Sequence, residues 1–320
     1  MERIVITGGA GFIGSALCER LLNEGNSVVC IDNLSSGRRL NIAHLESRES
    51  MLFLKKDITE HFSVEGSVDK VYHLASMASP KDFESHALEI ALTGSIGTLN
   101  ALELAREKNA RFLFTSTSEV YGQPTRHPQS EDYWGNVNPV GVRACYDESK
   151  RFSEMLSTVF GRTYGLDIRI ARIFNTYGPG MRPGDGRVIP NFVSQALQNR
   201  PITINGDGQQ TRSFCYIDDM VDGLIRLMNT EKLKDSGPVN LGSDREITVL
   251  QLANMIKDIT GSESKLVFNE MPQDDPVRRR PDIRKAYQLL GWKPKTALST
   301  GLRKVIERYQ STSSMKQNAK

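Results

Sequence analysis

Residues 3–14, RIVITGGAGFIG, constrain the fold more than any other part of the chain. Gly8, Gly11 and Gly14 stand between a run of β-branched residues and the start of a helical pattern. Such glycines permit a tight turn and a close backbone approach, and the helix N-terminus offers free amides to a pyrophosphate. A glycine triplet is a weak signal alone, but here Asp32 ends the next apolar run. The pattern predicts a dinucleotide-binding turn at the edge of a parallel sheet.

The first half of the sequence alternates short β-rich runs with helical patterns, as βαβ units do. Strands are expected at 3–7, 27–31, 51–55, 70–74, 112–116 and 168–172, and helices at 12–23, about 84–108 and about 146–164. With right-handed crossovers these segments predict a Rossmann-type doubly wound parallel sheet of the α/β class.

After residue 178 the sequence changes to Pro/Gly-rich turns and short helical patterns, and LGWKP at 290–294 should separate two helices. The predicted division is a dinucleotide-binding domain at 1–178, to which a segment around 213–243 returns, and a smaller C-terminal substrate-binding lobe at 179–310. Residues 311–320 are polar and are expected to form a frayed tail.

Composition excludes several classes of protein. The 320 residues are 25% charged with a net charge of only +3, which argues against a nucleic-acid partner. No apolar run is long enough to span a membrane and no signal-peptide pattern precedes residue 3, so we expect a cytoplasmic protein. The four cysteines, which show no CxxC or Cys/His spacing, are Cys18, Cys30, Cys145 and Cys215. They predict neither a metal site nor a disulfide, and we expect them to be buried as small apolar residues.

Asp32 is the residue that indicates which dinucleotide the protein binds. A carboxylate there accepts hydrogen bonds from ribose hydroxyls and repels a 2′-phosphate, so NAD is expected rather than NADP, although Arg38 and Arg39 could hold that phosphate. Asp57 and Ile58 would suit the adenine. The full set of expected cofactor contacts is Gly8, Gly11, Phe12, Ile13, Gly14, Asp32, Asn33, Ser36, Gly37, Asp57, Ile58, Leu74, Ala75, Ser76, Tyr146 and Lys150.

Tyr146 and Lys150 lie four residues apart, so they share one face of a helix. A nearby ammonium is expected to lower the phenol pKa and make Tyr146 a base near neutral pH. Thr117, in STSEVYG at 116–122, follows the fifth strand. It could hydrogen-bond the substrate hydroxyl from which Tyr146 takes a proton.

The GxxGxxG spacing, HLA at 73–75 and the YxxxK pair together resemble the extended short-chain dehydrogenase family. The resemblance implies that Thr117 positions an oxygen, Tyr146 is the base, and Lys150 tunes its pKa and anchors the NAD ribose. It also implies that His73 is a packing residue and not a catalyst.

Longer segments are similar to the UDP-glucuronate decarboxylases of that family. They are 127–151 (HPQSEDYWGNVNPVGVRACYDESKR), RIFNTYGPGM at 172–181, DGRVIPNF at 185–192, GDGQQTRSF at 206–214 and RRRPDIRKA at 278–286. The resemblance implies a UDP-sugar substrate contacted by Asn175, Arg187, Asn191 and Arg212. It places Glu119 in the catalytic set and Arg279 near the sugar carboxylate. Without the resemblance, Glu119 would be a solvated loop residue and Arg278 or Arg280 part of a solvated basic turn.

Two departures from that pattern leave the exact sugar open. The decarboxylases commonly carry Lys-Thr-Asn where this chain has Leu92, Thr93 and Gly94, and a tyrosine where it has Phe83. The alternatives to a decarboxylase are a nucleotide-sugar 4,6-dehydratase or epimerase, and a non-catalytic nucleotide-sugar sensor.

Apolar stripes on 84–108 and 146–164 predict a homodimer built on a four-helix bundle, unless the stripes only cover the sheet.

Overall fold

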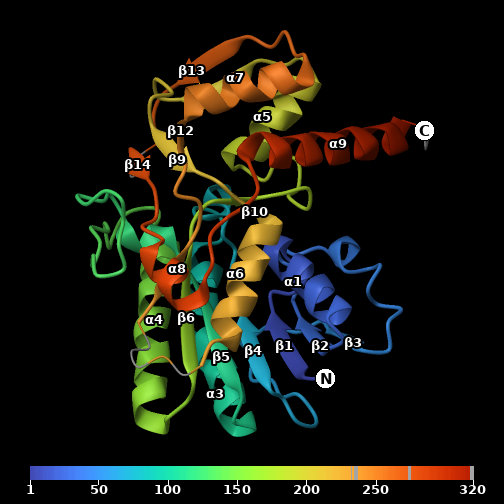
Figure 1. The fold of residues 1–320 in the computed structure, drawn as a ribbon, viewed down its shortest axis with the longest axis vertical. Coiled ribbons are helices and arrows are strands. Elements are labelled where there is room, and N and C mark those ends of the chain that lie inside the picture. Colours follow the sequence, from blue (N-terminus) through green and yellow to red (C-terminus); the bar gives the residue numbers. More distant parts are fainter. Residues whose placement is uncertain (232, 234–236, 273–274, 318–320) are drawn as a thin grey trace.

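The computed structural model describes residues 1–231, 233, 237–272 and 275–317, and its largest element is a parallel sheet. Within these residues seven strands pair in the order β11-β6-β5-β4-β1-β2-β3, all parallel (Figure 1). Their bounds are β1 Arg3–Thr7, β2 Ser27–Ile31, β3 Met51–Leu54, β4 Lys70–His73, β5 Arg111–Thr117, β6 Ile168–Ile173 and β11 Val239–Leu241. The predicted doubly wound α/β fold is therefore confirmed.

The strand order reverses between β1 and β4. The chain leaves β1 towards β2 and β3 on one side, whereas β4, β5 and β6 follow on the other. The loops after β1 and β4 therefore separate and leave a crevice at the carboxyl ends of the strands, which is where open α/β sheets bind ligands.

Helices cover both faces of the sheet, so neighbouring residues of one strand enter different cores. Ile4 and Ile6 pack under α1 and α6, whereas Val5 packs on the opposite side with residues of α3. This two-sided burial explains why the strands are continuous apolar runs. The helices concerned are α1 Phe12–Asn23, α2 Ala87–Leu92, α3 Thr98–Lys108, α4 Ala144–Tyr164 and α6 Ile217–Asn229. A π-helical turn, η3 (Thr93–Gly97), joins α2 to α3.

The second lobe lies over the carboxyl end of the sheet, at the top of Figure 1. It is built on three helices, α5 Val188–Leu197, α7 Val249–Thr260 and α9 Leu298–Gln317. Short strands tie it together: β8 Ile202–Asn205 pairs with β13 Leu266–Asn269, β12 Glu246–Thr248 and β14 Arg278–Arg279 flank β9 Thr211–Ser213, and β7 Thr176–Tyr177 pairs with β10 Cys215–Tyr216.

Breaks in the last part of the chain follow the sequence. Helix α8 (Arg284–Leu290) ends at Gly291, which has a φ of 59° in the left-handed region that glycine adopts readily. Trp292 then donates to the carbonyl of Asp219, 2.9 Å away, and fixes the turn before α9. Helix α9 continues to Gln317 and so includes most of the tail at 311–320 that was expected to fray. The residues of this tail are mostly polar but include no Pro or Gly, so a helix can continue through them. Residues 318–320 lie outside the described part. Among the described residues, no helix is both long and apolar enough to cross a bilayer.

Candidate active site

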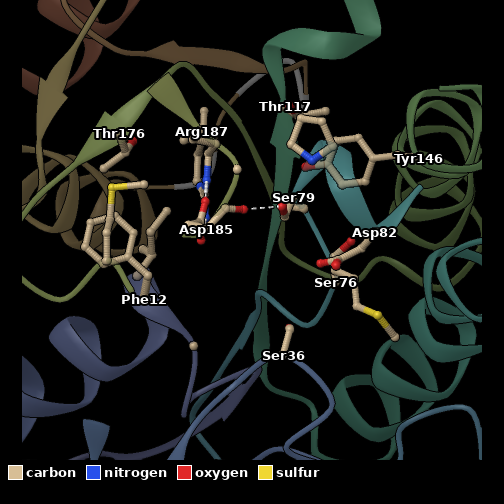
Figure 2. A pocket seen from close by; sticks show the side chains of 18 of the residues that line it. Phe12, Ser36, Ser76, Ser79, Asp82, Thr117, Tyr146, Thr176, Asp185 and Arg187 are labelled. Atoms are coloured by element: carbon tan, nitrogen blue, oxygen red, sulfur yellow. Dashed lines mark hydrogen bonds and ion pairs between the residues drawn. The ribbon is translucent and has the colours of Figure 1, made fainter. Parts of the chain in front are cut away.

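One cavity of about 580 Å³ lies between the carboxyl ends of the strands and the second lobe (Figure 2). Every residue that the sequence suggested for cofactor, substrate or catalysis lines it. The glycine-rich turn, the loop after β2 and the segment after β4 form one part of its wall. Thr117, Tyr146 and Lys150 stand in the middle, and α5 with the β9 region closes the far side. The fold thus brings together residues from both halves of the chain.

The glycine-rich turn is packed too closely for larger residues. Gly8 has a φ of 73°, and a Cβ there would lie 2.7 Å from the backbone of Ala75. A Cβ on Gly14 would lie 2.1 Å from the carbonyl oxygen of Gly8. Helix α1 begins at Phe12 without a side-chain hydrogen bond to its first amides, and the residues of its first turn line the cavity. The turn therefore fits the pyrophosphate of a dinucleotide.

Asp32 is held between that turn and the loop after β2. Its carboxylate accepts from the backbone N–H groups of Ala10, at 3.0 Å, and Leu34, at 2.8 Å. Burial raises the pKa of Asp32, although those two hydrogen bonds oppose the shift. Nearby, the Asn33 amide donates to Asp57 at 2.8 Å. The carboxylate and its neighbours fit a ribose with free hydroxyls, which is what the choice of NAD requires.

Tyr146 and Lys150 lie on one side of α4, with the Lys150 ammonium 5.8 Å from the centroid of the Tyr146 ring. The Lys150 ammonium donates to the carbonyl of Thr115, 2.9 Å away. Burial raises the pKa of Tyr146 to about 12, and a hydrogen bond with Thr117 offsets part of that shift. Burial likewise lowers the pKa of Lys150 to about 7. Burial is the largest influence on both groups in this structure, and the expected effect of Lys150 on Tyr146 stays a prediction.

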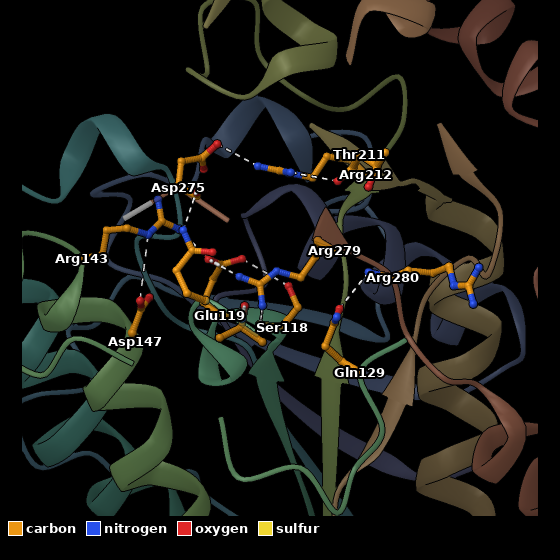
Figure 3. Close-up of polar contacts among 12 residues, drawn as sticks. Ser118, Glu119, Gln129, Arg143, Asp147, Thr211, Arg212, Asp275, Arg279 and Arg280 are labelled. Carbon is orange, nitrogen blue, oxygen red and sulfur yellow. Dashed lines mark hydrogen bonds and ion pairs between the residues drawn. The ribbon is translucent and has the colours of Figure 1, made fainter. Parts of the chain in front are cut away.

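Glu119 is held by two arginines at the turn after β5. Arg143 approaches its Oε2 atom to 2.5 Å and Arg279 approaches the same oxygen to 3.3 Å (Figure 3). Burial alone would raise the pKa of Glu119, but Arg279 and Arg143 together hold it at about 2. Glu119 is therefore a buried, paired carboxylate and not a solvated loop residue.

Other arginines approach the cavity from the second lobe. Arg212 on β9 donates to Asp275 at 2.8 Å, and Arg187, at the start of α5, pairs with Asp185. Asn175 and Asn191 also line this side. Ser79, from the opposite wall, donates to the carbonyl of Asp185 and joins the two walls across the cavity (Figure 2).

Sequence reasoning assigned no role to Arg143 or Asp147. Both lie beside Glu119, because Arg143 precedes Tyr146 by three residues and so faces the same side of the start of α4. That spacing indicates from the sequence that Arg143 lies on the Tyr146 side of α4, but it does not specify the pairing with Glu119.

The positions that depart from the decarboxylase pattern lie in or near the cavity. Phe83 lines the cavity and stacks on Tyr146 with ring centroids 5.3 Å apart. Thr93 also lines it, whereas Leu92 does not line the cavity and is 36% exposed.

His73 and the cysteines behave as packing residues. His73 is buried, its ring nitrogens bond to Thr7 at 2.7 Å and Thr98 at 3.1 Å, and burial lowers its pKa to about 3. Cys18, Cys30 and Cys215 are buried and Cys145 is partly buried, all as free thiols. In the described part of the chain, no cluster of His, Cys, Asp or Glu could hold a metal ion.

Comparisons with known proteins agree on one family. Residues 4–242 match the model of the NAD dependent epimerase/dehydratase family. The UDP-glucuronic acid decarboxylase 1 of Xenopus tropicalis is 48% identical over 97% of this chain and 72% of its own length. UDP-glucuronic acid decarboxylase 3 of Arabidopsis thaliana is 50% identical over 94% of this chain and 86% of its own. Among solved structures, the UDP-glucuronic acid 4-epimerase of Bacillus cereus, in complex with UDP-glucuronic acid and NAD, superposes with a TM-score of 0.87 at 30% identity, covering 97% of this chain and 99% of that one.

Proposed function

The chain belongs to the NAD-dependent epimerase/dehydratase family, and we propose that it converts UDP-glucuronate to UDP-xylose and carbon dioxide. The observation that carries the proposal is the group formed by Glu119 with Arg143 and Arg279. Glu119 lies just after the end of β5, two residues beyond Thr117 and close to Tyr146. A uronate needs both the oxidation chemistry of the Thr117, Tyr146 and Lys150 group and positive charge for its own carboxylate.

The cofactor of this family is NAD, and the residues of this chain fit it. The glycine-rich turn would receive the pyrophosphate, Asp32 the adenosine ribose, and Lys150 the ribose next to the nicotinamide. When bound, NAD supplies a hydride acceptor and donor at C4 of the sugar.

The side chains of this protein would then manage protons and charge. Thr117 and Tyr146 hold the C4 hydroxyl, and Tyr146, acting in its phenolate form, takes the hydroxyl proton as C4 is oxidised. The resulting ketone is β to the carboxylate, so the C5–C6 bond can break with its electron pair delocalised onto the C4 oxygen, which the same two hydroxyls stabilise. Carbon dioxide leaves, a proton enters at C5, and C4 is reduced again. Glu119 lies where it can orient the water or hydroxyl that delivers the C5 proton.

Other members of the family act differently on related nucleotide-sugars, and the Bacillus cereus structure is an example whose name specifies 4-epimerisation of the same uronate. An epimerase would keep the carboxylate, and a 4,6-dehydratase would require a 6-hydroxyl. A non-catalytic sensor would show no turnover, which the presence of Thr117, Tyr146 and Lys150 in one cavity argues against.

The deciding experiment is incubation of the NAD-loaded protein with UDP-glucuronate, followed by chromatographic separation of the nucleotide-sugars against UDP-xylose and UDP-galacturonate standards, mass analysis, and measurement of carbon dioxide. UDP-xylose is the expected product, and Glu119→Gln should abolish most of its formation while NAD binding survives. A loss of charge in a closed site commonly costs about a hundredfold or more. UDP-galacturonate as the only product would replace the proposal with epimerisation.

We also propose that the protein is a homodimer. Helix α4 exposes Phe152, Met155 and Val159 at helical spacing. The segment α2–η3–α3 exposes a second apolar stripe, made of Leu88, Leu92, Ile96 and Leu99. Two such stripes from each of two copies can bury one another as a four-helix bundle.

The domain division and the cellular location stay predictions. Support for the return of the 213–243 segment to the first domain comes from β11, which pairs with β6, and from α6, which packs against the sheet. We keep residues 1–178 as the NAD-binding part and 179–310 as the substrate-binding part. The cytoplasmic location rests on the sequence alone.

A further inference from the structure

We infer that Arg143 is the specificity-determining residue that receives the sugar carboxylate, and that Asp147 is its positioning residue. The inference rests on the proposed function and refines it. The resemblance to the decarboxylases had suggested Arg279 for this role, and the contacts of the two arginines differ in a way that favours Arg143.

Arg279 is committed to the protein. One arm of its guanidinium donates to the carbonyl of Ser118 at 2.6 Å and the other to Glu119 at 3.3 Å. Its side chain is only 2% exposed. Arg279 therefore fixes the turn after β5 and holds Glu119 in place, but presents little surface to a ligand.

Arg143 lies at the start of α4 on the cavity wall, and its side chain is 16% exposed. One arm reaches Glu119 at 2.5 Å, while its Nε atom lies 4.0 Å from Asp147 (Figure 3). The guanidinium carbon lies 5.5 Å from the centroid of the Phe83 ring, which in turn stacks on Tyr146. Phe83 therefore contacts both the arginine and the tyrosine that would hold the C4 hydroxyl, and all three side chains line one cavity.

The proximity of Glu119 to Tyr146 bears on where the sugar carboxylate would lie. In a uronate the carboxylate carbon is two bonds from C4, so a sugar with its C4 hydroxyl on Tyr146 can place that carboxylate near Glu119 and Arg143. Two carboxylates at this distance repel unless a cation separates them. Arg143 can hold both, because its planar fork has several donors.

Asp147 can hold Arg143 in position and balance the charge of the site. It is buried, one of its oxygens has no hydrogen-bond partner, and it faces Glu119, Arg143 and Arg279. Its burial and the negative charge of Glu119 raise its pKa to about 7, against the pull of Arg143 and Arg279. Asp147 can therefore keep Arg143 in place as a carboxylate, or take up a proton when the ligand brings a further negative charge into the site.

The test compares two ligands that differ only in carbon 6. UDP-glucuronate carries the carboxylate and UDP-xylose lacks it, so UDP-xylose also reports whether the rest of the site is intact. Affinities are measured by calorimetry on the NAD-loaded protein in a Tyr146→Phe background, in which turnover should be slowed by roughly a hundredfold or more. Arg143→Gln, Arg143→Lys and Arg279→Gln are compared, with Arg226→Gln as a control on the exposed face of α6.

In the Arg143→Gln variant, UDP-glucuronate affinity should fall at least about tenfold, the scale of one lost charged hydrogen bond, while UDP-xylose affinity changes less than about twofold. Arg143→Lys should recover part of the loss and Arg226→Gln should change neither affinity. Equal losses for both ligands, or a selective loss only in Arg279→Gln, would overturn the role of Arg143 and leave the proposed function intact. A background protein that does not bind UDP-glucuronate at all would overturn the proposed function and this inference with it.

Discussion

The ammonium nitrogen of Lys150 lies 2.9 Å from the carbonyl oxygen of Thr115, to which it donates a hydrogen bond. Thr115 belongs to the last part of β5, so the contact fixes α4 to the sheet directly behind Thr117 and Tyr146. The Lys150 ammonium also lies 4.8 Å from the centroid of the Phe114 ring. A lysine this buried carries its charge at a cost, and burial lowers its pKa to about 7.

NAD binding should therefore depend on pH around neutrality. The ammonium form of Lys150 donates charge-assisted, stronger hydrogen bonds to Thr115 and to a ribose hydroxyl, and this form is lost as the pH rises through about 7 in the free protein. We expect NAD affinity to weaken over that range. Calorimetric titration across it is the measurement, and in Lys150→Met the affinity should be lower and independent of pH there. A wild-type affinity that stays constant would show that another group anchors the ribose.

NAD should bind much better than NADP. The carboxylate of Asp32 is held by the amides of Ala10 and Leu34, so it cannot easily turn away from a 2′-phosphate. Like charge then disfavours NADP. Parallel titrations with the two dinucleotides should differ by at least about tenfold, and Asp32→Ala should narrow the difference. Equal affinities in the wild-type protein would mean that Arg38 or Arg39 compensates.

Asp147→Asn should stabilise the protein more at alkaline than at acid pH. In the unfolded chain this carboxyl has its usual pKa, whereas folding raises it to about 7. The folded state thus holds a proton that the unfolded state has lost, and the stability from this group falls as the pH rises through about 7. Asparagine has no charge to bury. Thermal unfolding of both proteins at about pH 5 and about pH 8 gives the comparison, and the gain in melting temperature should be larger at the higher pH.

The homodimer can be tested on α4. Phe152→Glu puts a charge into the proposed bundle, whereas Leu289→Glu puts one on α8, at a position of similar exposure (42% against 43%). Light scattering at micromolar concentration should give a dimer mass for the wild type and for Leu289→Glu, and a smaller mass for Phe152→Glu. A monomeric wild type would leave the apolar stripes without this explanation.

Much of the fold could be predicted because the strands of the first half are buried on both faces. Runs such as residues 3–7 and 27–31 are then apolar throughout, and the helices between them have one apolar side. Strand β11 was not predicted, because its three residues pair with a strand far away in the sequence. The two-residue strand β14 is equally invisible, although it brings Arg279 to Glu119.

The site shows the same limit. The sequence motifs predicted that Thr117, Tyr146 and Lys150 lie together, because one residue stands at the end of a strand and the other two share one side of a helix. The pairing of Glu119 with Arg143 crosses a long loop and depends on how α4 starts, which no local pattern specifies. The orientation of Lys150 towards Thr115 was missed for a related reason, since burial and not spacing determines the partner and the pKa of a charged side chain.

The last prediction concerns the balance between oxidation and reduction in the proposed reaction. Loss of carbon dioxide from UDP-glucuronate to give UDP-xylose involves no net oxidation, so the cofactor should end as it began. Tyr146 is placed to take the C4 proton and to give it back, and the second lobe closes the cavity in which the 4-keto sugar would wait, with Ser79 and Asp185 joined across it. Carbon dioxide should therefore form without an equal amount of NADH, and deuterium placed at C4 of the substrate should be found at C4 of the product. In Tyr146→Phe, loss of the deuterated substrate and appearance of the product should slow together, by roughly a hundredfold or more, because one hydroxyl serves both steps. NADH that accumulates one for one with carbon dioxide would instead show that the 4-keto pentose leaves the cavity and that the reaction ends at oxidative decarboxylation.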